Sequence, residues 1–271
     1  MPTVSLPTGI SLYYEERGSG EPVLLIMGTG ADHSLWDATA DAFASRHRVV
    51  TYDNRGTGSS DHPADSSSYS MRLLADDAAA LLDAIGIDRA HVAGNSLGST
   101  VAQELAINHP GKVASLQLHC TWGRTDAWLD RLFRSMAYPV EHDDMAAFAV
   151  CAFMWVLSPA YLNDFPEQVA EIEAAYLANP PSKAGLLGHL HADRAHDALG
   201  RLGEITAPTL ITSGEMDWQI PTRYGRAVER RIPGSRLHVF EGPFSSHCAF
   251  IEMADEFNEV SLAFIAEHLE H

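Results

Sequence analysis

The sequence is poor in cysteine: its 271 residues include only Cys120, Cys151 and Cys248, and no CxxC pair is present. An odd number of isolated cysteines disfavours both a disulfide framework and a structural zinc site. This usage is typical of a reducing compartment, so we expect a cytoplasmic protein. The first residues, MPTVSLPTG, lack the basic start and apolar core of an export signal, and none is expected.

The sequence also lacks positive charge. It has 18 Lys and Arg against 36 Asp and Glu, a formal net charge of −18. An acidic surface repels phosphate backbones and anionic lipids, so nucleic-acid and membrane-surface functions are disfavoured. No apolar run is long enough to span a bilayer. Because 46% of the residues are hydrophobic, the chain can instead bury the core of a large α/β domain, and a small molecule is the expected partner.

Seven short segments rich in Val, Ile and Leu are predicted to be strands. They are residues 11–16, 23–27, 48–52, 91–94, 113–119, 209–214 and 236–240. Several are almost continuously apolar, as strands buried on both faces are. Helical patterns separate most of them, and the clearest covers residues 70–85. Strand and helix in alternation predict a mostly parallel sheet with helices on both faces.

Residues 121–202 interrupt this alternation, because they contain helical patterns and prolines but no convincing strand. We therefore expect three segments: a first part of the core at residues 1–120, a helical insertion at 121–202, and the rest of the core at 203–271. The insertion follows the strand predicted at 113–119. It should lie over the carboxyl ends of the strands, where ligands of open α/β sheets bind.

The segment GNSLG, residues 94–98, places Ser96 between two glycines where a strand pattern gives way to a helical one. A turn this abrupt strains its central residue and leaves no room for neighbouring side chains, which accounts for Gly94 and Gly98. The pattern predicts a nucleophile elbow that exposes the Ser96 hydroxyl. The backbone N–H of Leu97, at the start of a helix, would face an oxyanion formed there.

A serine nucleophile needs a base, and the base needs an orienting carboxylate. His247 is the favoured base, because its polar segment FEGPFSSHC follows the last predicted strand. Asp217 is the favoured carboxylate, because TLITSGEMD places it just after a strand end. Glu215 in the same turn and Asp126 in the insertion remain alternatives. The chain order Ser, Asp, His is that of α/β-hydrolases.

His189 and His191 are spaced by one residue, but no third ligand accompanies them. We expect both on a helix of the insertion and expect no metal. The proposed chemistry requires no organic cofactor either.

Several motifs resemble the α/β-hydrolase superfamily along almost the whole chain. They are the hairpin TGISLYYEERGSG, the turn DNRGTGSS at residues 53–60, GNSLG and GEMD. The chain is most similar to enol-lactonase-like enzymes and to polyketide-tailoring esterases and thioesterases. The resemblance implies an α/β-hydrolase fold, with a mostly parallel eight-stranded sheet flanked by helices and a helical cap insertion. It also suggests a role in secondary metabolism.

The resemblance implies that the N–H groups of Thr29 and Leu97 form the oxyanion hole. Many relatives carry histidine before Gly28, whereas this chain has Met27. That replacement removes a polar support of the loop but no oxyanion donor, because the donors are backbone groups.

The predicted function is therefore a serine hydrolase that cleaves an ester, thioester or lactone of a hydrophobic small molecule through an acyl-enzyme on Ser96. Apolar side chains of the insertion and of the sheet edge are candidates for the substrate pocket, although each alone is more typical of core. The candidates are Trp36, Trp122, Met154, Trp155, Trp218 and Phe244, with Trp128 and Phe153 beside them.

Two alternatives remain open. The same three side chains would serve a hydrolase of carbon–carbon bonds in aromatic degradation. The fold could also carry a non-hydrolytic cyclase or a small-molecule binding protein. The sequence does not indicate an oligomeric state.

Overall fold

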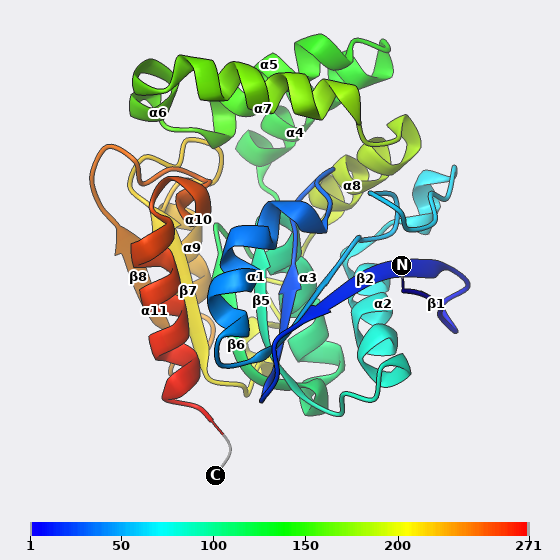
Figure 1. Cartoon of the computed structure of the whole chain (residues 1–271), viewed down its shortest axis with the longest axis vertical. Helices are drawn as coiled ribbons and strands as arrows, with labels where there is room; N and C mark the ends of the chain where they lie inside the picture. The colour runs from blue at the N-terminus through cyan, green and yellow to red at the C-terminus, as the bar shows by residue number, and fades with distance from the viewer. Residues whose placement is uncertain (1, 270–271) are drawn as a thin grey trace.

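The computed structural model describes residues 2–269 and shows one twisted eight-stranded sheet with helices packed against it (Figure 1). The strand order is β1-β2-β4-β3-β5-β6-β7-β8, and only β1 and β2 pair antiparallel to their neighbours. The strands are β1 (Thr3–Ser5), β2 (Ser11–Arg17), β3 (Pro22–Ile26), β4 (Arg48–Tyr52), β5 (Ala90–Asn95), β6 (Val113–His119), β7 (Thr209–Gly214) and β8 (Arg236–Phe240). The predicted fold class is confirmed.

Helices follow most strands of the core. They are α1 (Asp37–Ala44), α2 (Met71–Ala84), α3 (Leu97–Asn108), α9 (Arg223–Glu229), α10 (Ala249–Glu252) and α11 (Ala254–Ala266), with short 3₁₀ helices at His33–Trp36, Ser66–Ser68, Pro110–Lys112 and Leu202–Glu204. The helix predicted at 70–85 is α2, and the Ser70 hydroxyl caps it by accepting the Leu73 N–H.

The sheet separates two apolar cores, and β3 contributes to both because its side chains alternate between the faces. Leu24 and Ile26 belong to the core that contains side chains of α2 and α3. Val23 and Leu25 belong to the core that contains side chains of α1 and α11. Burial on both faces explains why the central strands are almost continuously apolar in sequence.

Five helices lie between β6 and β7 in the sequence: α4 (Ala127–Glu141), α5 (Met145–Val156), α6 (Pro159–Asp164), α7 (Pro166–Ala178) and α8 (Lys183–Ala195). They have an apolar core of their own, which includes Trp122, Leu129, Phe133 and Leu190. Figure 1 shows α5, α6 and α7 beyond one end of the strands, with α8 nearer to the sheet. A bridge between Arg124 and Asp197 joins the two ends of this segment.

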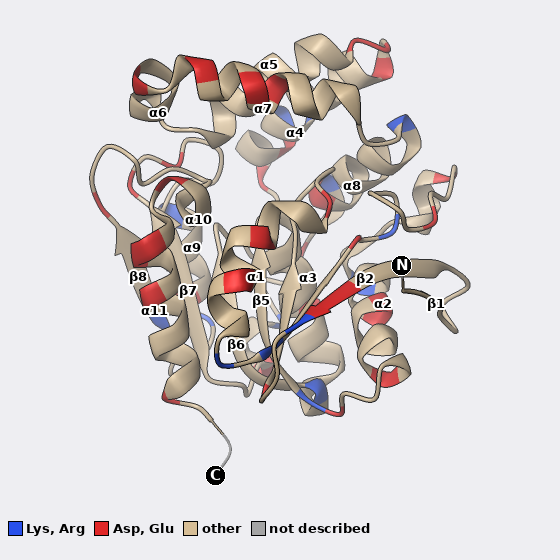
Figure 2. Cartoon of the chain, in the orientation of Figure 1, with Lys and Arg blue, Asp and Glu red and all other residues tan. Residues whose placement is uncertain are grey.

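Acidic residues are spread over the sheet, its flanking helices and the inserted helices (Figure 2). No helix among residues 2–269 is both long and apolar enough to cross a bilayer. The predicted segment boundaries at 120 and 202 stay a prediction, and residues 1, 270 and 271 of the outer segments lie outside the described part of the chain.

Candidate active site

Ser96 occupies the single residue between β5 and α3, with φ 56° and ψ −124°. A backbone of this kind is strained by roughly 1–3 kcal/mol in a non-glycine residue. A Cβ at Gly94 would lie 2.1 Å from the Gly98 carbonyl oxygen, and one at Gly98 would lie 2.1 Å from the Ile26 carbonyl oxygen. The two glycines are thus required by close backbone approach on both sides of the serine, which turns its side chain out of the sheet.

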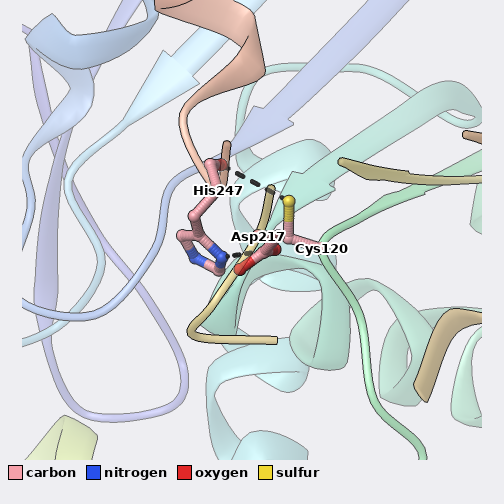
Figure 3. Close-up of side chains that lie close together, drawn as sticks. All are labelled: Cys120, Asp217 and His247. Atoms are coloured by element: carbon pink, nitrogen blue, oxygen red, sulfur yellow. Dashed lines mark hydrogen bonds and ion pairs between the residues drawn. The ribbon is translucent and has the colours of Figure 1, made fainter. Parts of the chain in front are cut away.

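His247 and Asp217 form a buried pair at the same end of the sheet (Figure 3). His247 Nδ1 lies 2.9 Å from Asp217 Oδ2, and the two residues are only 4% and 2% exposed. The other carboxylate oxygen of Asp217 accepts the N–H of Ile220 at 2.8 Å. Because both oxygens have partners, the carboxylate is held in one orientation and leaves Nε2 of His247 available.

The two alternative carboxylates are engaged elsewhere. Glu215 is exposed and accepts the N–H of Gly242 at 3.3 Å. Asp126 caps α4 by accepting the N–H groups of Trp128 and Leu129, and it also accepts the Tyr224 hydroxyl. Neither residue bonds His247.

The end of β6 connects the serine to the histidine. The Ser96 N–H donates to the His119 carbonyl at 3.0 Å, and the next residue, Cys120, donates its thiol to the His247 carbonyl at 3.3 Å. Cys120 adopts a positive φ of 51° to do so. Burial raises the pKa of the Cys120 thiol, so it remains a neutral donor rather than a second nucleophile. Sequence patterns did not indicate this contact, because nothing local marks residue 120.

The loop after β3 runs directly beside the elbow. A Cβ at Gly28 would lie 3.1 Å from the Ser96 Cβ, so this loop fits against the serine only because residue 28 is glycine. Thr29 follows it, and its hydroxyl donates to Asp193 at 2.7 Å. Leu97 is the first residue of α3, where backbone N–H groups have no acceptor within the helix. The two predicted oxyanion donors therefore come from segments that flank Ser96.

The predicted pocket residues fall into two groups. Trp36 and Trp122 are fully buried in apolar cores, the first against Phe250 and the second against Phe133. The remaining four lie near or at the surface: Met154 and Trp218 are about half exposed, and Trp155 and Phe244 are half-buried. Trp36 and Trp122 thus pack as core, the ordinary outcome for such residues.

Among the described residues, two groups of side chains have the spacing of metal ligands: Cys120, Asp217 and His247, and Asp32, His33 and Asp53. The first group would require a thiolate, which burial of Cys120 opposes. In the second, Asp53 accepts the N–H groups of His33 and Ser59, as expected of a turn.

His189 and His191 both lie on α8, as expected, but in different environments. His191 is exposed, whereas His189 is fully buried and accepts the Gly30 N–H at 3.1 Å. The sequence did not indicate this role, because the two bonded residues are 159 positions apart. Glu252 was also missed: it accepts hydrogen bonds from Ser158, 94 positions away, and from Ser246.

Comparison with known proteins agrees with this architecture. A family model described as "alpha/beta hydrolase fold" matches residues 21–253. The chain belongs to the α/β-hydrolase family. The predictions of a family member and of a hydrolase that acts on ester-type bonds are confirmed at this general level.

Individual relatives carry the following names. The chain is 32% identical to "Putative carbamate hydrolase RutD" of Azorhizobium caulinodans, with 94% of this chain and 95% of that protein covered. The enol-lactonase of Burkholderia xenovorans LB400 superimposes with a TM-score of 0.89 at 25% identity, covering 98% of this chain and 100% of that one. A thermophilic esterase from Thermogutta terrifontis superimposes with a TM-score of 0.87 at 26% identity, covering 99% and 100%.

Proposed function

We propose that the protein is a serine hydrolase that cleaves ester-type bonds through an acyl-enzyme on Ser96. The observation that carries this proposal is the buried pair of His247 and Asp217, 2.9 Å apart, together with the strained serine elbow at Ser96. All three residues follow carboxyl ends of parallel strands in one sheet, and the end of β6 links them by hydrogen bonds.

The proposed reaction has two steps. In the first, His247 Nε2 takes the Ser96 proton while the serine oxygen bonds to the acyl carbon, and the proton then passes to the leaving group as its bond to carbon breaks. In the second, His247 takes a proton from water as the water oxygen bonds to the acyl carbon; the bond between that carbon and the Ser96 oxygen then breaks, the proton returns to Ser96, and the acid is released. Asp217 holds the imidazole in the required tautomer and stabilises its charged form.

The backbone N–H groups of Thr29 and Leu97 would hold the oxyanion in both steps. Removing one such donor typically costs about 3–4 kcal/mol of transition-state stabilisation. The stabilisation of the oxyanion therefore depends on how rigidly the loop after β3 and the start of α3 are held beside Ser96.

We propose a hydrophobic small molecule as the substrate, bound between the sheet and the inserted helices, with residues 121–202 acting as a cap. Met154 and Trp155 are on α5, whose last residue, Val156, accepts the Cys248 N–H at 3.2 Å. Trp218 follows Asp217, and Phe244 precedes His247 by three residues. Two of these four apolar side chains therefore belong to the loops that carry Asp217 and His247, and the other two belong to a helix that is hydrogen-bonded to the residue after His247.

The names of the relatives support an acyl carbon bonded to a leaving heteroatom, because carbamates, lactones and esters share this group. The cysteine usage supports a cytoplasmic location.

A fluorophosphonate probe and a series of p-nitrophenyl esters test this function. We expect wild-type protein to be labelled at Ser96 and to hydrolyse octanoate faster than acetate. Ser96→Ala should abolish labelling and lower turnover by at least about 10⁴-fold, with an unchanged melting curve. Ser135→Ala, at an exposed serine of α4, is the matched control. Folded wild-type protein that is neither labelled nor active on esters would refute the proposal.

A further inference from the structure

Helix α8 contacts the loop that would carry one oxyanion donor. We call Met27–Gly30 the oxyanion loop. The Gly30 N–H donates to His189 Nδ1 at 3.1 Å, and the Thr29 hydroxyl donates to Asp193 Oδ2 at 2.7 Å. His189 and Asp193 are four residues apart on α8, so one face of the helix presents both side chains to consecutive residues of the loop.

The two hydrogen bonds of His189 specify its protonation. Nδ1 accepts from Gly30, and Nε2 lies 2.8 Å from the Arg55 carbonyl, which can only accept. Only the neutral imidazole with its proton on Nε2 satisfies both partners. Burial agrees with this assignment, because it lowers the pKa of His189 to about 4. The ring therefore joins the oxyanion loop to the turn that contains Arg55.

Asp193 is also held in its neutral form. It is fully buried, and burial raises the pKa of its carboxyl to about 8. Its Oδ1 atom has no hydrogen-bond partner among the described residues, and the Thr29 hydroxyl is the side-chain partner of Oδ2. An ionised carboxylate with a single donor would be costly at this depth, whereas a neutral carboxyl is tolerated.

Two glycines allow α8 to approach this closely. A Cβ at Gly185 would lie 1.9 Å from the Gly56 carbonyl oxygen, and a Cβ at Gly188 would lie 2.4 Å from the Tyr69 ring. The helix is thus seated directly on the DNRGTGSS turn. In this position His189 bonds the Gly30 N–H and the Arg55 carbonyl at the same time.

We propose that His189 and Asp193 are positioning residues that fix the oxyanion loop, so that the Thr29 N–H is oriented toward the oxyanion before substrate arrives. The bond from Gly30 fixes the peptide plane that follows Thr29, and the bond to Asp193 fixes the Thr29 side chain. The Met27 side chain offers the loop no polar group, and the Asn54 amide supports it from another side by donating to the Met27 carbonyl at 3.0 Å. The inference rests on the proposed function of Ser96.

Paired substitutions test this inference. His189→Phe and Asp193→Leu remove the hydrogen bonds, whereas His189→Asn and Asp193→Asn keep an acceptor near the original position and cannot carry charge. His191→Ala, on the exposed side of α8, is the matched control. For hydrolysis of p-nitrophenyl butyrate we expect kcat to fall about 10- to 100-fold in His189→Phe and Asp193→Leu, since a misaligned donor loses part of its 10²- to 10³-fold effect.

A positioning role of His189 and Asp193 predicts a specific pattern of changes in KM, kcat and inhibitor affinity. KM should change less than about threefold, and the asparagine variants should recover most of the lost kcat. The inhibition constant of a trifluoromethyl ketone, whose adduct with Ser96 carries the oxyanion, should rise in proportion to the loss of kcat/KM. Melting curves of all variants report folding separately.

The outcomes separate this inference from the proposed function. Wild-type enzyme that is labelled at Ser96 and active, together with folded His189→Phe and Asp193→Leu variants of unchanged kcat, would overturn the inference alone. The inference would also be overturned by a second result. In that result kcat falls only in step with the melting temperature, the asparagine variants do not recover kcat, and the ketone inhibits the variants as strongly as wild type. A wild-type protein that fails both labelling and hydrolysis would reject the proposed function and this inference with it.

Discussion

The oxyanion loop is held by α8 of the insertion, whereas the histidine loop is held by Glu252 of α10, which also binds Ser158 of the insertion, and the chemistry of the two supports differs. We call Ser245–Cys248 the histidine loop. The oxyanion loop is bonded to the neutral side chains of His189 and Asp193 on α8. The histidine loop is bonded to the carboxylate of Glu252, which accepts the Ser246 hydroxyl at 2.6 Å together with the N–H and hydroxyl of Ser158, the residue before α6.

The comparison shows two ways to place a titratable group inside a protein. Asp193 has one donor for its carboxyl and is kept neutral by burial, which raises its pKa to about 8. Glu252 has three donors, and although burial raises its pKa, the hydrogen bonds from Ser158 and Ser246 oppose that shift. Each donor to a carboxylate stabilises its charge, so the three donors of Glu252 offset more of the effect of burial than the single donor of Asp193 does.

The largest effect is expected from Gly185→Ala, which would disrupt only the support of the oxyanion loop. Alanine in a helix is normally more stable than glycine by about 1 kcal/mol. Here its Cβ would lie 1.9 Å from the Gly56 carbonyl oxygen, so α8 must move outward. We expect a melting temperature lower by at least about 5 °C and a kcat reduced at least tenfold, measured by circular dichroism and ester hydrolysis.

Gly200→Ala is the control for this prediction, because a Cβ there would meet no atom within 4 Å. A Gly185→Ala protein as stable as wild type would mean that α8 is not seated on the turn as described.

A smaller effect is expected from Glu252→Gln, which weakens the support of the histidine loop. The amide keeps one acceptor oxygen but places an NH₂ group against a serine, so a buried donor loses its partner at a cost of about 1–3 kcal/mol. We expect kcat to fall about 5- to 30-fold. The inhibition constant of the trifluoromethyl ketone should rise in proportion to the loss of kcat/KM. Glu259→Gln, at an exposed position of α11, should behave as wild type.

Asp193→Asn sharpens the comparison through pH. The folded protein holds the Asp193 proton up to a pKa of about 8, whereas the unfolded chain releases it near the ordinary pKa of 3.9. Between these values the unfolded state binds fewer protons, so wild-type stability falls as pH rises. The asparagine variant has no carboxyl at residue 193, so its stability does not fall with pH in this way. Its melting temperature relative to wild type should therefore increase from pH 5 to pH 8 by at least about 3 °C and then level off.

A melting-temperature difference that is independent of pH would contradict this assignment of a neutral carboxyl. Glu252→Gln should show the same sign, because burial also raises the pKa of Glu252: the melting temperature of this variant relative to wild type should rise with pH as that carboxyl ionises.

The smallest effect on kcat is expected from Ser158→Ala, which removes one of three donors to Glu252 and leaves the Ser158 N–H in place. A single hydrogen bond to a charged group contributes about 1.5–3 kcal/mol, so we expect a melting temperature lower by about 3–8 °C and kcat within about threefold of wild type. A larger loss of kcat than in Glu252→Gln would show that α6, rather than the carboxylate, sets the histidine loop.

Much of this architecture could be predicted from local pattern. The seven expected strands coincide within one residue with β2 to β8, because each is a short apolar run between turns. The strand that was missed, β1 at Thr3–Ser5, has three residues and an exposed polar face, so it has no apolar run to detect. The constraint at Gly94 was also predictable, since its Cβ would meet Gly98 four residues on, whereas the constraint at Gly98 comes from Ile26 of another strand.

The candidate site was predictable only in part. Ser96, Asp217 and His247 could be proposed because each stands in a recognisable turn after a strand. Their catalytic roles stay a prediction until the labelling and kinetics above are done. The apolar candidates were harder, because a tryptophan in sequence does not indicate whether it packs inside, as Trp36 does, or lies half exposed, as Trp218 does.

The chain's periodicity and turn residues thus specify the strands, the helices and the strained serine, because those features depend on interactions within a few residues. Folding alone assigned His189, Asp193 and Glu252 to the loops beside that serine. Their protonation depends on burial, and their bonds to Gly30, Thr29 and Ser158 join segments more than 90 residues apart, which no pattern of neighbouring residues records.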